Sequence, residues 1–89
     1  TKNLQNLEFC HNLQNLEYLF IRDTPSLSSI YPLRNSNKLK YLNISDSNVY
    51  SIECLMDKNI SYLDISNTLV PLREVIAFKK FNPNCFVQF

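Results

Sequence analysis

The nine residues Leu39–Ser47, LKYLNISDS, decide the fold because two other stretches of the chain share their pattern. These stretches are Leu16–Thr24, LEYLFIRDT, and Ile60–Thr68, ISYLDISNT. Each has aliphatic residues at positions one, four and six, Tyr at position three, and Ser or Thr at position nine. Their first residues are 23 and 21 positions apart, a spacing that is typical of solenoid turns and too long for a hairpin repeat. We therefore interpret the chain as stacked copies of one small unit.

Each nine-residue stretch is predicted to form a short strand, because positions three, five and seven alternate with apolar positions four and six. The strands then lie side by side in a parallel sheet with their aliphatic side chains pointing inward. Burial of Leu42 and Ile44 should contribute about 1.5 to 3 kcal/mol each. Between the strands, apolar residues recur every three positions, which favours short 3-10 or helical turns on the other side of the sheet. These residues are Leu27, Ile30 and Leu33 in one segment, and Val49, Ile52 and Leu55 in the next.

The alignment also places the ends of the chain. Residues 7–16 align better with residues 30–39 than with a strand stretch, so residues 1–15 are interpreted as the back half of a turn whose strand precedes Thr1. By this interpretation the chain is the C-terminal piece of a longer array. The predicted organisation is a single domain over 1–89, with a partial turn at 1–15, turns at 16–38, 39–59 and 60–81, and a terminal strand at about 84–89.

A helix is predicted from about residue 71 to residue 81. Pro71 suits the first helical turn, and Glu74 suits the positive N-terminal end of a helix. Lys79 and Lys80 suit the negative C-terminal end.

The residues after this helix are expected to continue the sheet. Cys85–Val87 lies 22 positions after Leu63–Ile65, which sets the predicted register. Together with the helix, Phe86 and Phe89 are expected to close the array at this edge. The alternative is that the edge is a contact surface, because an exposed apolar edge strand pairs readily with another chain.

Residues 30–39, IYPLRNSNKL, and residues 47–52, SNVYSI, carry a resemblance to a known family. They are similar to the phrases IxPLxxLxxL and NxIxxI of leucine-rich repeat proteins with short repeats of about 22 residues. This type of repeat is found in bacterial internalins and in a leucine-rich regulatory subunit of protein phosphatase 1. The chain departs from the family in the Ser or Thr at position nine, in Ser36 where Leu is usual, and in its column of Tyr residues.

This resemblance implies the fold class α/β, as a leucine-rich repeat solenoid. Short parallel β-strands would lie on the concave face, 3-10 or helical turns would lie on the convex face, and a C-terminal helix and a final strand would follow. The family implies a non-enzymatic protein-binding scaffold and leaves the ligand open.

The composition argues against several classes of function. The net charge is +1 with 19% charged residues, so the chain lacks the broad positive field that steers proteins to nucleic acid or anionic lipid. It contains no Gly, which excludes glycine-rich phosphate loops and dinucleotide fingerprints. No apolar run approaches the roughly 20 residues needed to span a bilayer.

Side chains that carry catalysis or bind metals are few. His11 is the only His, and one His with three dispersed Cys lacks the spacing of a metal site. Cys10 and Cys85 align with aliphatic core positions, where we expect buried and inert thiols. Cys54 aligns with Pro32 and is the best candidate for a reactive thiol. We therefore predict no enzymatic activity, no cofactor and no metal.

The outward columns of the predicted sheet form the candidate binding face. Position three holds Tyr in all three stretches, and residues of one column of a parallel sheet lie about 4.8 Å apart. Tyr and Arg are enriched in interaction hot spots, although Tyr is also simply a good strand residue. Carboxylates among the rings favour a basic peptide or protein loop and disfavour nucleic acid, which needs a cationic groove. The candidate protein-binding residues are Tyr18, Phe20, Arg22, Tyr41, Asn43, Asp46, Tyr62 and Asp64.

Three Cys without a framework spacing favour reduced thiols and a cytoplasmic location. The alternative is a secreted or cell-surface adhesin or receptor segment, to which the N-glycosylation sequons at Asn43 and Asn59 would point. A further alternative is a purely structural C-terminal cap of a larger protein.

Solenoid ends without caps tend to associate. We therefore also expect self-association through an uncapped apolar face that comprises Leu4, Leu7, Leu13 and Leu16.

Overall fold

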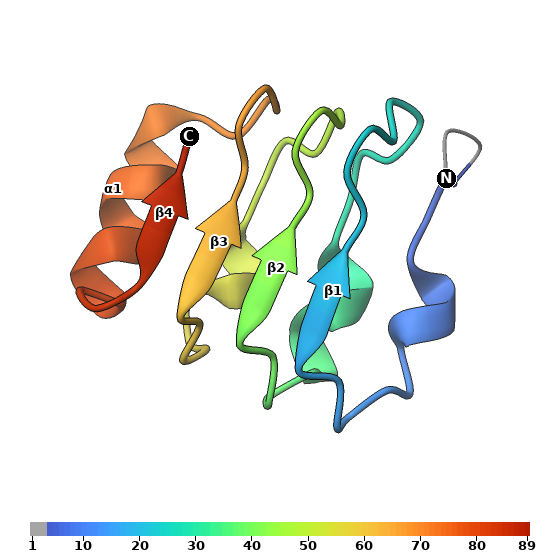
Figure 1. The fold of residues 1–89 in the computed structure, drawn as a ribbon, viewed down its shortest axis with the longest axis horizontal. Coiled ribbons are helices and arrows are strands. Elements are labelled where there is room, and N and C mark those ends of the chain that lie inside the picture. The colour runs from blue at the N-terminus through green and yellow to red at the C-terminus, as the bar shows by residue number, and fades with distance from the viewer. Residues whose placement is uncertain (1–3) are drawn as a thin grey trace.

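The computed structural model describes residues 4–89 and contains one sheet of four parallel strands in the order β1-β2-β3-β4 (Figure 1). Neighbouring strands pair in register, so that Tyr41 lies opposite Tyr18 and Tyr62, and Leu42 lies opposite the equivalent leucines. The structure confirms the predicted parallel arrangement of β1, β2 and β3 and the predicted pairing of their tyrosines. The strands are β1 (Tyr18–Phe20), β2 (Tyr41–Asn43), β3 (Tyr62–Asp64) and β4 (Phe86–Gln88).

A helical segment precedes each strand; in Figure 1 the two middle segments lie behind the strands, whereas the first lies beside β1 and the last beside β4, at the two ends of the sheet. The first three are short 3-10 helices, as the threefold apolar spacing predicts, and the fourth is an α-helix. The 3-10 helices pack against one another in chain order. The segments are η1 (Glu8–Cys10), η2 (Tyr31–Asn35), η3 (Glu53–Leu55) and α1 (Leu72–Phe81).

The core fills the space between the sheet and these helical segments. Leu42, Ile44 and Leu63 from the sheet side are fully buried. The apolar residues that recur every three positions in the connecting segments are buried with them. These are Leu27, Ile30, Leu33, Val49, Ile52 and Leu55.

The chain leaves each of the first three strands through the same tight turn. The residue at position eight has a φ between 55° and 59°, in the left-handed region that Asp and Asn enter at lower cost than β-branched residues. The following hydroxyl donates to the carbonyl oxygen three residues earlier, at 2.7 to 3.1 Å. Position nine therefore holds a small hydroxyl side chain that satisfies the turn locally. The pairs are Asp23 and Thr24, Asp46 and Ser47, and Asn67 and Thr68.

Helix α1 begins within one residue of the predicted start and ends at the predicted residue. Phe78 is fully buried in the core. Glu74 is also buried, and its Oε1 accepts hydrogen bonds from the Ser51 hydroxyl at 3.1 Å and from the Ile52 N–H at 2.8 Å. This carboxylate therefore ties the helix to the segment that leads into η3. Within residues 4–89, every helix is too short or too polar to cross a lipid bilayer.

The register of β4 differs from the prediction. Phe86 lies opposite Tyr62 and Val87 lies opposite Leu63, whereas the prediction places Cys85 opposite Leu63. An α-helix advances about 1.5 Å per residue and a 3-10 helix about 2.0 Å, so α1 needs more residues to cover the same distance. The shift of two residues keeps Cys85 on the buried side and puts Phe86 in the Tyr row, not in a closing role at the end of the array.

The N-terminal end of the sheet is less exposed than predicted. Leu7 is fully buried, and Leu4 and Leu16 are partly buried against the core, because η1 packs on η2. Of the four leucines predicted to form an exposed face, Leu13 alone is exposed, at 42%.

Candidate protein-binding face

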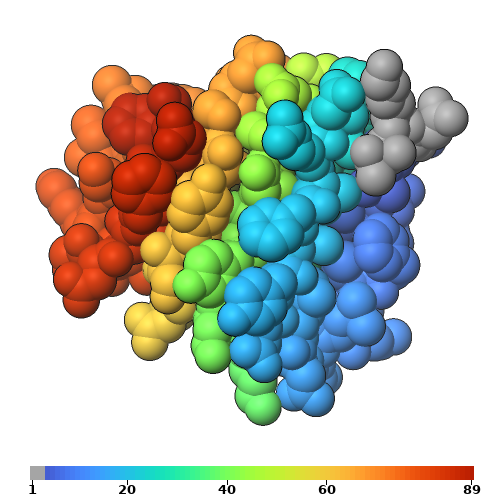
Figure 2. All heavy atoms as spheres, viewed as in Figure 1, coloured from blue at the N-terminus to red at the C-terminus, as the bar shows by residue number. Residues whose placement is uncertain are grey.

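The outer face of the sheet carries a row of four stacked aromatic rings, one from each strand. Ring centroids are 4.9, 6.2 and 5.6 Å apart from one strand to the next, and the planes are tilted by 12° to 26°. Figure 2 looks onto this face, where large side chains of the four strands lie next to one another, from β1 in blue to β4 in red. We call this row the aromatic ladder, and its members are Tyr18, Tyr41, Tyr62 and Phe86.

The sequence pattern predicts three rungs of the aromatic ladder and misses the fourth. Phe86 lies between two inward side chains, Cys85 and Val87, so its outward direction follows from the alternation of the strand. The predicted register, however, places Phe86 beside Asp64 in the next row and not beside Tyr62. Because the register of β4 differs by two residues from the predicted one, the sequence pattern does not predict that Phe86 is the fourth ring of the ladder.

The aromatic ladder offers ring edges to a partner more than ring faces. Tyr41 and Tyr62 each stack with a neighbour on both sides, so their faces are covered. Tyr18 and Phe86, which are 55% and 58% exposed, each keep one open face at the ends of the ladder. Ring edges carry partial positive charge, and Tyr hydroxyls both donate and accept hydrogen bonds. This arrangement suits contact with a peptide better than base stacking, which needs open ring faces.

Asn43 and Asp64, in the row next to the ladder, are partly occupied by local hydrogen bonds. Asn43 Oδ1 accepts from the Ser45 N–H at 3.0 Å and from the Ser45 hydroxyl at 2.7 Å. Asp64 Oδ1 accepts from the Ser66 N–H at 3.0 Å and from the Ser66 hydroxyl at 2.6 Å. The Tyr62 hydroxyl reaches Asp64 Oδ2 only at 3.5 Å, which is too long for a strong hydrogen bond. Asp64 Oδ2 and the Asn43 amide N–H groups are therefore the atoms open to a partner.

The remaining candidate residues differ in position. Phe20 is 58% exposed and lies beside Asn43 in the register of the sheet. Arg22 and Asp46 lie beyond the ends of their strands and are exposed. Asp46 Oδ1 accepts from the Asn67 amide at 2.8 Å. The structure thus groups six of the eight predicted residues in two adjacent rows, namely Tyr18, Phe20, Tyr41, Asn43, Tyr62 and Asp64.

The charge near this face is predominantly negative. Asp23, Asp46 and Asp64 contribute three carboxylates, against one guanidinium from Arg22. The single ion pair within residues 4–89 joins Lys40 to a glutamate at 3.2 Å, near the start of the strands. Because the three carboxylates are not neutralised by ion pairs in that range, the face suits a cationic partner.

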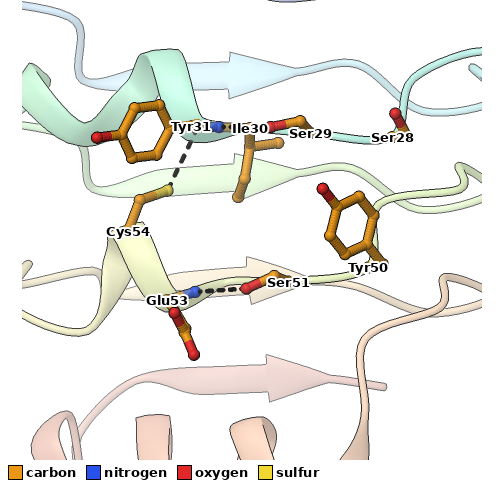
Figure 3. A pocket seen from close by; sticks show the side chains of 8 residues that line it. All are labelled: Ser28, Ser29, Ile30, Tyr31, Tyr50, Ser51, Glu53 and Cys54. Atoms are coloured by element: carbon orange, nitrogen blue, oxygen red, sulfur yellow. Dashed lines mark hydrogen bonds between the residues drawn. The ribbon is translucent and has the colours of Figure 1, made fainter.

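A groove lies between the segments that contain η2 and η3, away from the aromatic ladder (Figure 3). Its volume is about 600 Å³. Tyr31 and Tyr50, which are 61% and 58% exposed, stand on either side of Ile30 in Figure 3. The Arg34 guanidinium lies over the Tyr31 ring, 4.2 Å from its centroid. The lining residues are Ser28, Ser29, Ile30, Tyr31, Tyr50, Ser51, Glu53 and Cys54.

Cys54 lies in this groove and is partly exposed, as its alignment predicts, whereas Cys10 and Cys85 are buried. Its Sγ donates to the Ile30 carbonyl oxygen at 3.3 Å. Burial raises the pKa of the Cys54 thiol from 9.0 to about 11, and the nearby Lys58 charge offsets this only in part. Burial also raises the pKa of Cys10 and Cys85, which are core residues as predicted. The three thiols are therefore protonated at neutral pH.

Native Cys54 is expected to react slowly with iodoacetamide near neutral pH. A pKa of about 11 in place of 9.0 leaves roughly 100-fold fewer thiolates. Labelling should accelerate as the pH rises toward the folded pKa, because deprotonation produces the nucleophile. Peptide mapping by mass spectrometry after timed quenching measures the rate, with the urea-unfolded chain as control. Equal rates for native and unfolded Cys54 would contradict the burial argument.

Within residues 4–89, no three His, Cys, Asp or Glu side chains are grouped as metal ligands would be. A scan against models of known protein families finds no match to this chain, and a search of curated proteins finds none either. The role of the candidate protein-binding face is therefore inferred from the geometry of its residues.

Proposed function

We propose that this chain is a leucine-rich repeat protein without catalytic activity that binds a protein or peptide through the outer, concave face of its sheet. The observation that carries the proposal is the aromatic ladder, in which four rings form a continuous row on a solvated face. Contiguous exposed apolar surface of this kind marks interaction sites, and Tyr is among the residues that dominate binding energy.

The leucine-rich repeat assignment is supported by local features that recur along the chain. Each of the first three strands is three residues long, follows a 3-10 helix and precedes a turn with positive φ. The strands pair in parallel with no offset between their tyrosines. A solenoid of stacked units requires this kind of recurrence, because each unit buries its apolar side against the next.

The partner that fits best is a basic peptide or loop in an extended conformation. Asp64 Oδ2 has one weak contact, and Asp46 engages one of its two oxygens, so both carboxylates retain acceptor capacity for Lys or Arg. The apolar parts of the same peptide would contact the ring edges of the ladder and the Phe20 ring. Nucleic acid fits less well because its phosphates would meet carboxylates.

Replacing Tyr41 and Tyr62 together by Ala is expected to weaken peptide binding by about tenfold or more, since truncating hot-spot residues costs about 1–2 kcal/mol or more. The peptides are selected from a displayed library on the immobilised wild-type chain, and their affinities are measured by calorimetry. The double variant removes three ring pairs, each of which contributes about 0.5–1.5 kcal/mol beyond the burial of area, so circular dichroism is measured first to verify that the variant is folded.

The matched control is the double variant Tyr31→Ala and Tyr50→Ala, which removes two exposed rings from the groove between η2 and η3. This variant should bind the selected peptides as the wild type does. If the selected peptides bind the Tyr41 and Tyr62 variant unchanged, or depend on Tyr31 and Tyr50, the outer face of the sheet is not the binding site.

A further inference from the structure

The groove between the segments that contain η2 and η3 combines an apolar base with two exposed aromatic rings. Ile30 lines the groove and is almost fully buried, so it lies at the base. Tyr31 and Tyr50 stand on either side of it (Figure 3). The volume of about 600 Å³ is within the range of about 300–1,000 Å³ that is usual for ligand sites.

The two tyrosines are spaced along the groove by a distance that the chain determines. The Tyr50 N–H donates to the Ser28 carbonyl oxygen at 3.4 Å, so Tyr50 and Ser28 lie side by side on neighbouring turns. Tyr31 follows Ser28 by three residues. Three residues of an extended chain span at most about 10 Å, which therefore limits the separation of the two tyrosine Cα atoms along the groove.

This spacing matches one turn of a polyproline II helix. That helix has three residues per turn and rises about 3.1 Å per residue, so residues three positions apart lie on the same side, about 9 Å from each other. Side chains on one face of a β-strand recur about every 6.8 Å, and neighbouring side chains on one face of an α-helix lie about 5–6 Å apart. Both of these spacings fit the two tyrosines less well.

Three hydroxyl groups of the groove can donate hydrogen bonds to a ligand. Ser29 Oγ accepts from the Tyr31 N–H at 3.2 Å, which leaves its own O–H as a donor. Ser28 is exposed, and Tyr50 directs its oxygen toward Ile30 in Figure 3. Proline residues lack an N–H and offer only carbonyl acceptors, which have no internal partner in a polyproline II helix. The donors of the groove thus match the acceptors of such a ligand.

The charges around the groove favour an uncharged ligand, because acidic and basic side chains are equal in number. The Arg34 guanidinium lies over the Tyr31 ring, and Lys58 Nζ donates to the Arg34 carbonyl oxygen at 2.7 Å. The Glu53 side chain points away from Ile30 in Figure 3. The charged residues in the lining or next to it are Glu53, Asp57, Glu74, Arg34, Lys58 and Arg73.

We propose that this groove binds a proline-rich segment of a partner protein in the polyproline II conformation. Successive turns of the segment pack against the Tyr31 and Tyr50 rings, and its carbonyl oxygens accept hydrogen bonds from the hydroxyl groups of Ser28, Ser29 and Tyr50. Aromatic-lined grooves recognise such segments because the preformed helix loses little entropy on binding. The groove is separate from the outer face of the sheet, and the proposal does not depend on the function of that face.

Titration of the isotope-labelled chain with a proline octamer, followed by NMR, tests the proposal. The amide signals of Ser28, Ser29 and Tyr50 should shift and saturate. The double variant Tyr31→Ala and Tyr50→Ala should bind the octamer about tenfold more weakly or worse. The matched double variant Tyr41→Ala and Tyr62→Ala, on the outer face, should bind it as the wild type does. Absence of a saturable shift in the wild type, or unchanged affinity of the Tyr31 and Tyr50 variant, would overturn the proposal.

Two further comparisons test the class of ligand. Tyr50→Phe keeps the ring and removes the donor, so it should weaken binding of the octamer several-fold. A glycine-serine octamer, which is a flexible coil, should not bind, and equal binding of the two octamers would contradict recognition of a polyproline II helix. Saturable binding of cellohexaose without binding of the proline octamer would assign the groove to carbohydrate and overturn the proposal.

The proline octamer also keeps the groove and the outer face apart in experiments. Peptides for the outer face are selected in the presence of excess octamer, so that the groove is already occupied. Binding of the octamer, together with selected peptides that do not depend on Tyr41 and Tyr62, would support the groove and contradict the function proposed for the outer face. The reverse pattern would overturn the groove proposal alone.

Discussion

Replacing Phe78 by Ala is expected to lower the free energy of unfolding by about 3–5 kcal/mol, the range for deleting a buried ring and leaving a cavity. Phe78 is fully buried, and it anchors α1 to the core. Domains of this size have a total stability of about 5–15 kcal/mol, so the variant should be largely unfolded at moderate urea concentrations. Urea titration followed by circular dichroism measures the loss.

Phe81 provides the matched control, because it is the same residue type at the end of the same helix and is 71% exposed. Phe81→Ala should change the free energy of unfolding by less than about 0.5 kcal/mol, as most surface substitutions do. Similar losses for the two variants would mean that α1 does not close the core through Phe78.

The sheet could be predicted from the sequence because two independent patterns agree within each strand. Alternation at positions three to seven determines which side chains point inward, and the matching tyrosines determine which residues become neighbours. Leu42 and Leu63 are fully buried and in register for this reason. The threefold spacing that ends at Leu55 likewise predicts a 3-10 helix, which the structure contains.

The C-terminal end was less predictable because its connecting segment has a different helical rise. The position of α1 follows from Pro71 and from the charges at its ends, but the number of residues needed to reach β4 depends on how α1 packs. That packing determines whether Phe86 lies beside Tyr62 or Asp64, and hence whether the aromatic ladder has a fourth ring. A residue count taken from the earlier turns cannot supply this information.

Other features of the candidate site depend on contacts between turns. Partial burial raises the pKa of the Cys54 thiol, which bonds to the Ile30 carbonyl of the preceding turn, and the sequence around Cys54 does not reveal this environment. Asn43 and Asp64 were predicted as binding residues from their column alone. Each also closes a local turn through the serine two residues later, so their substitution would affect the fold as well as binding.

Replacing Glu74 by Ala is expected to lower the free energy of unfolding by about 2–3 kcal/mol, because it leaves the buried Ile52 N–H without its acceptor. Glu74 Oε1 accepts that N–H at 2.8 Å and the Ser51 hydroxyl at 3.1 Å. The Glu74 carboxylate thus supplies the acceptor for the backbone N–H of Ile52, where α1 lies next to the segment that leads into η3. The effect should appear as faster amide hydrogen exchange at Ile52 and as a lower urea midpoint.

The informative comparison is with Glu74→Gln, which keeps an oxygen acceptor of the same reach and removes the charge. Because the Gln oxygen can still accept both hydrogen bonds, this variant should retain most of the stability that Glu74→Ala loses. Exposed Glu53 on η3 gives the surface control, and Glu53→Ala should leave exchange at Ile52 unchanged. Equal stability of the Ala and Gln variants would mean that the acceptor oxygen of Glu74 does not hold α1 against η3, and that packing around Phe78 does so alone.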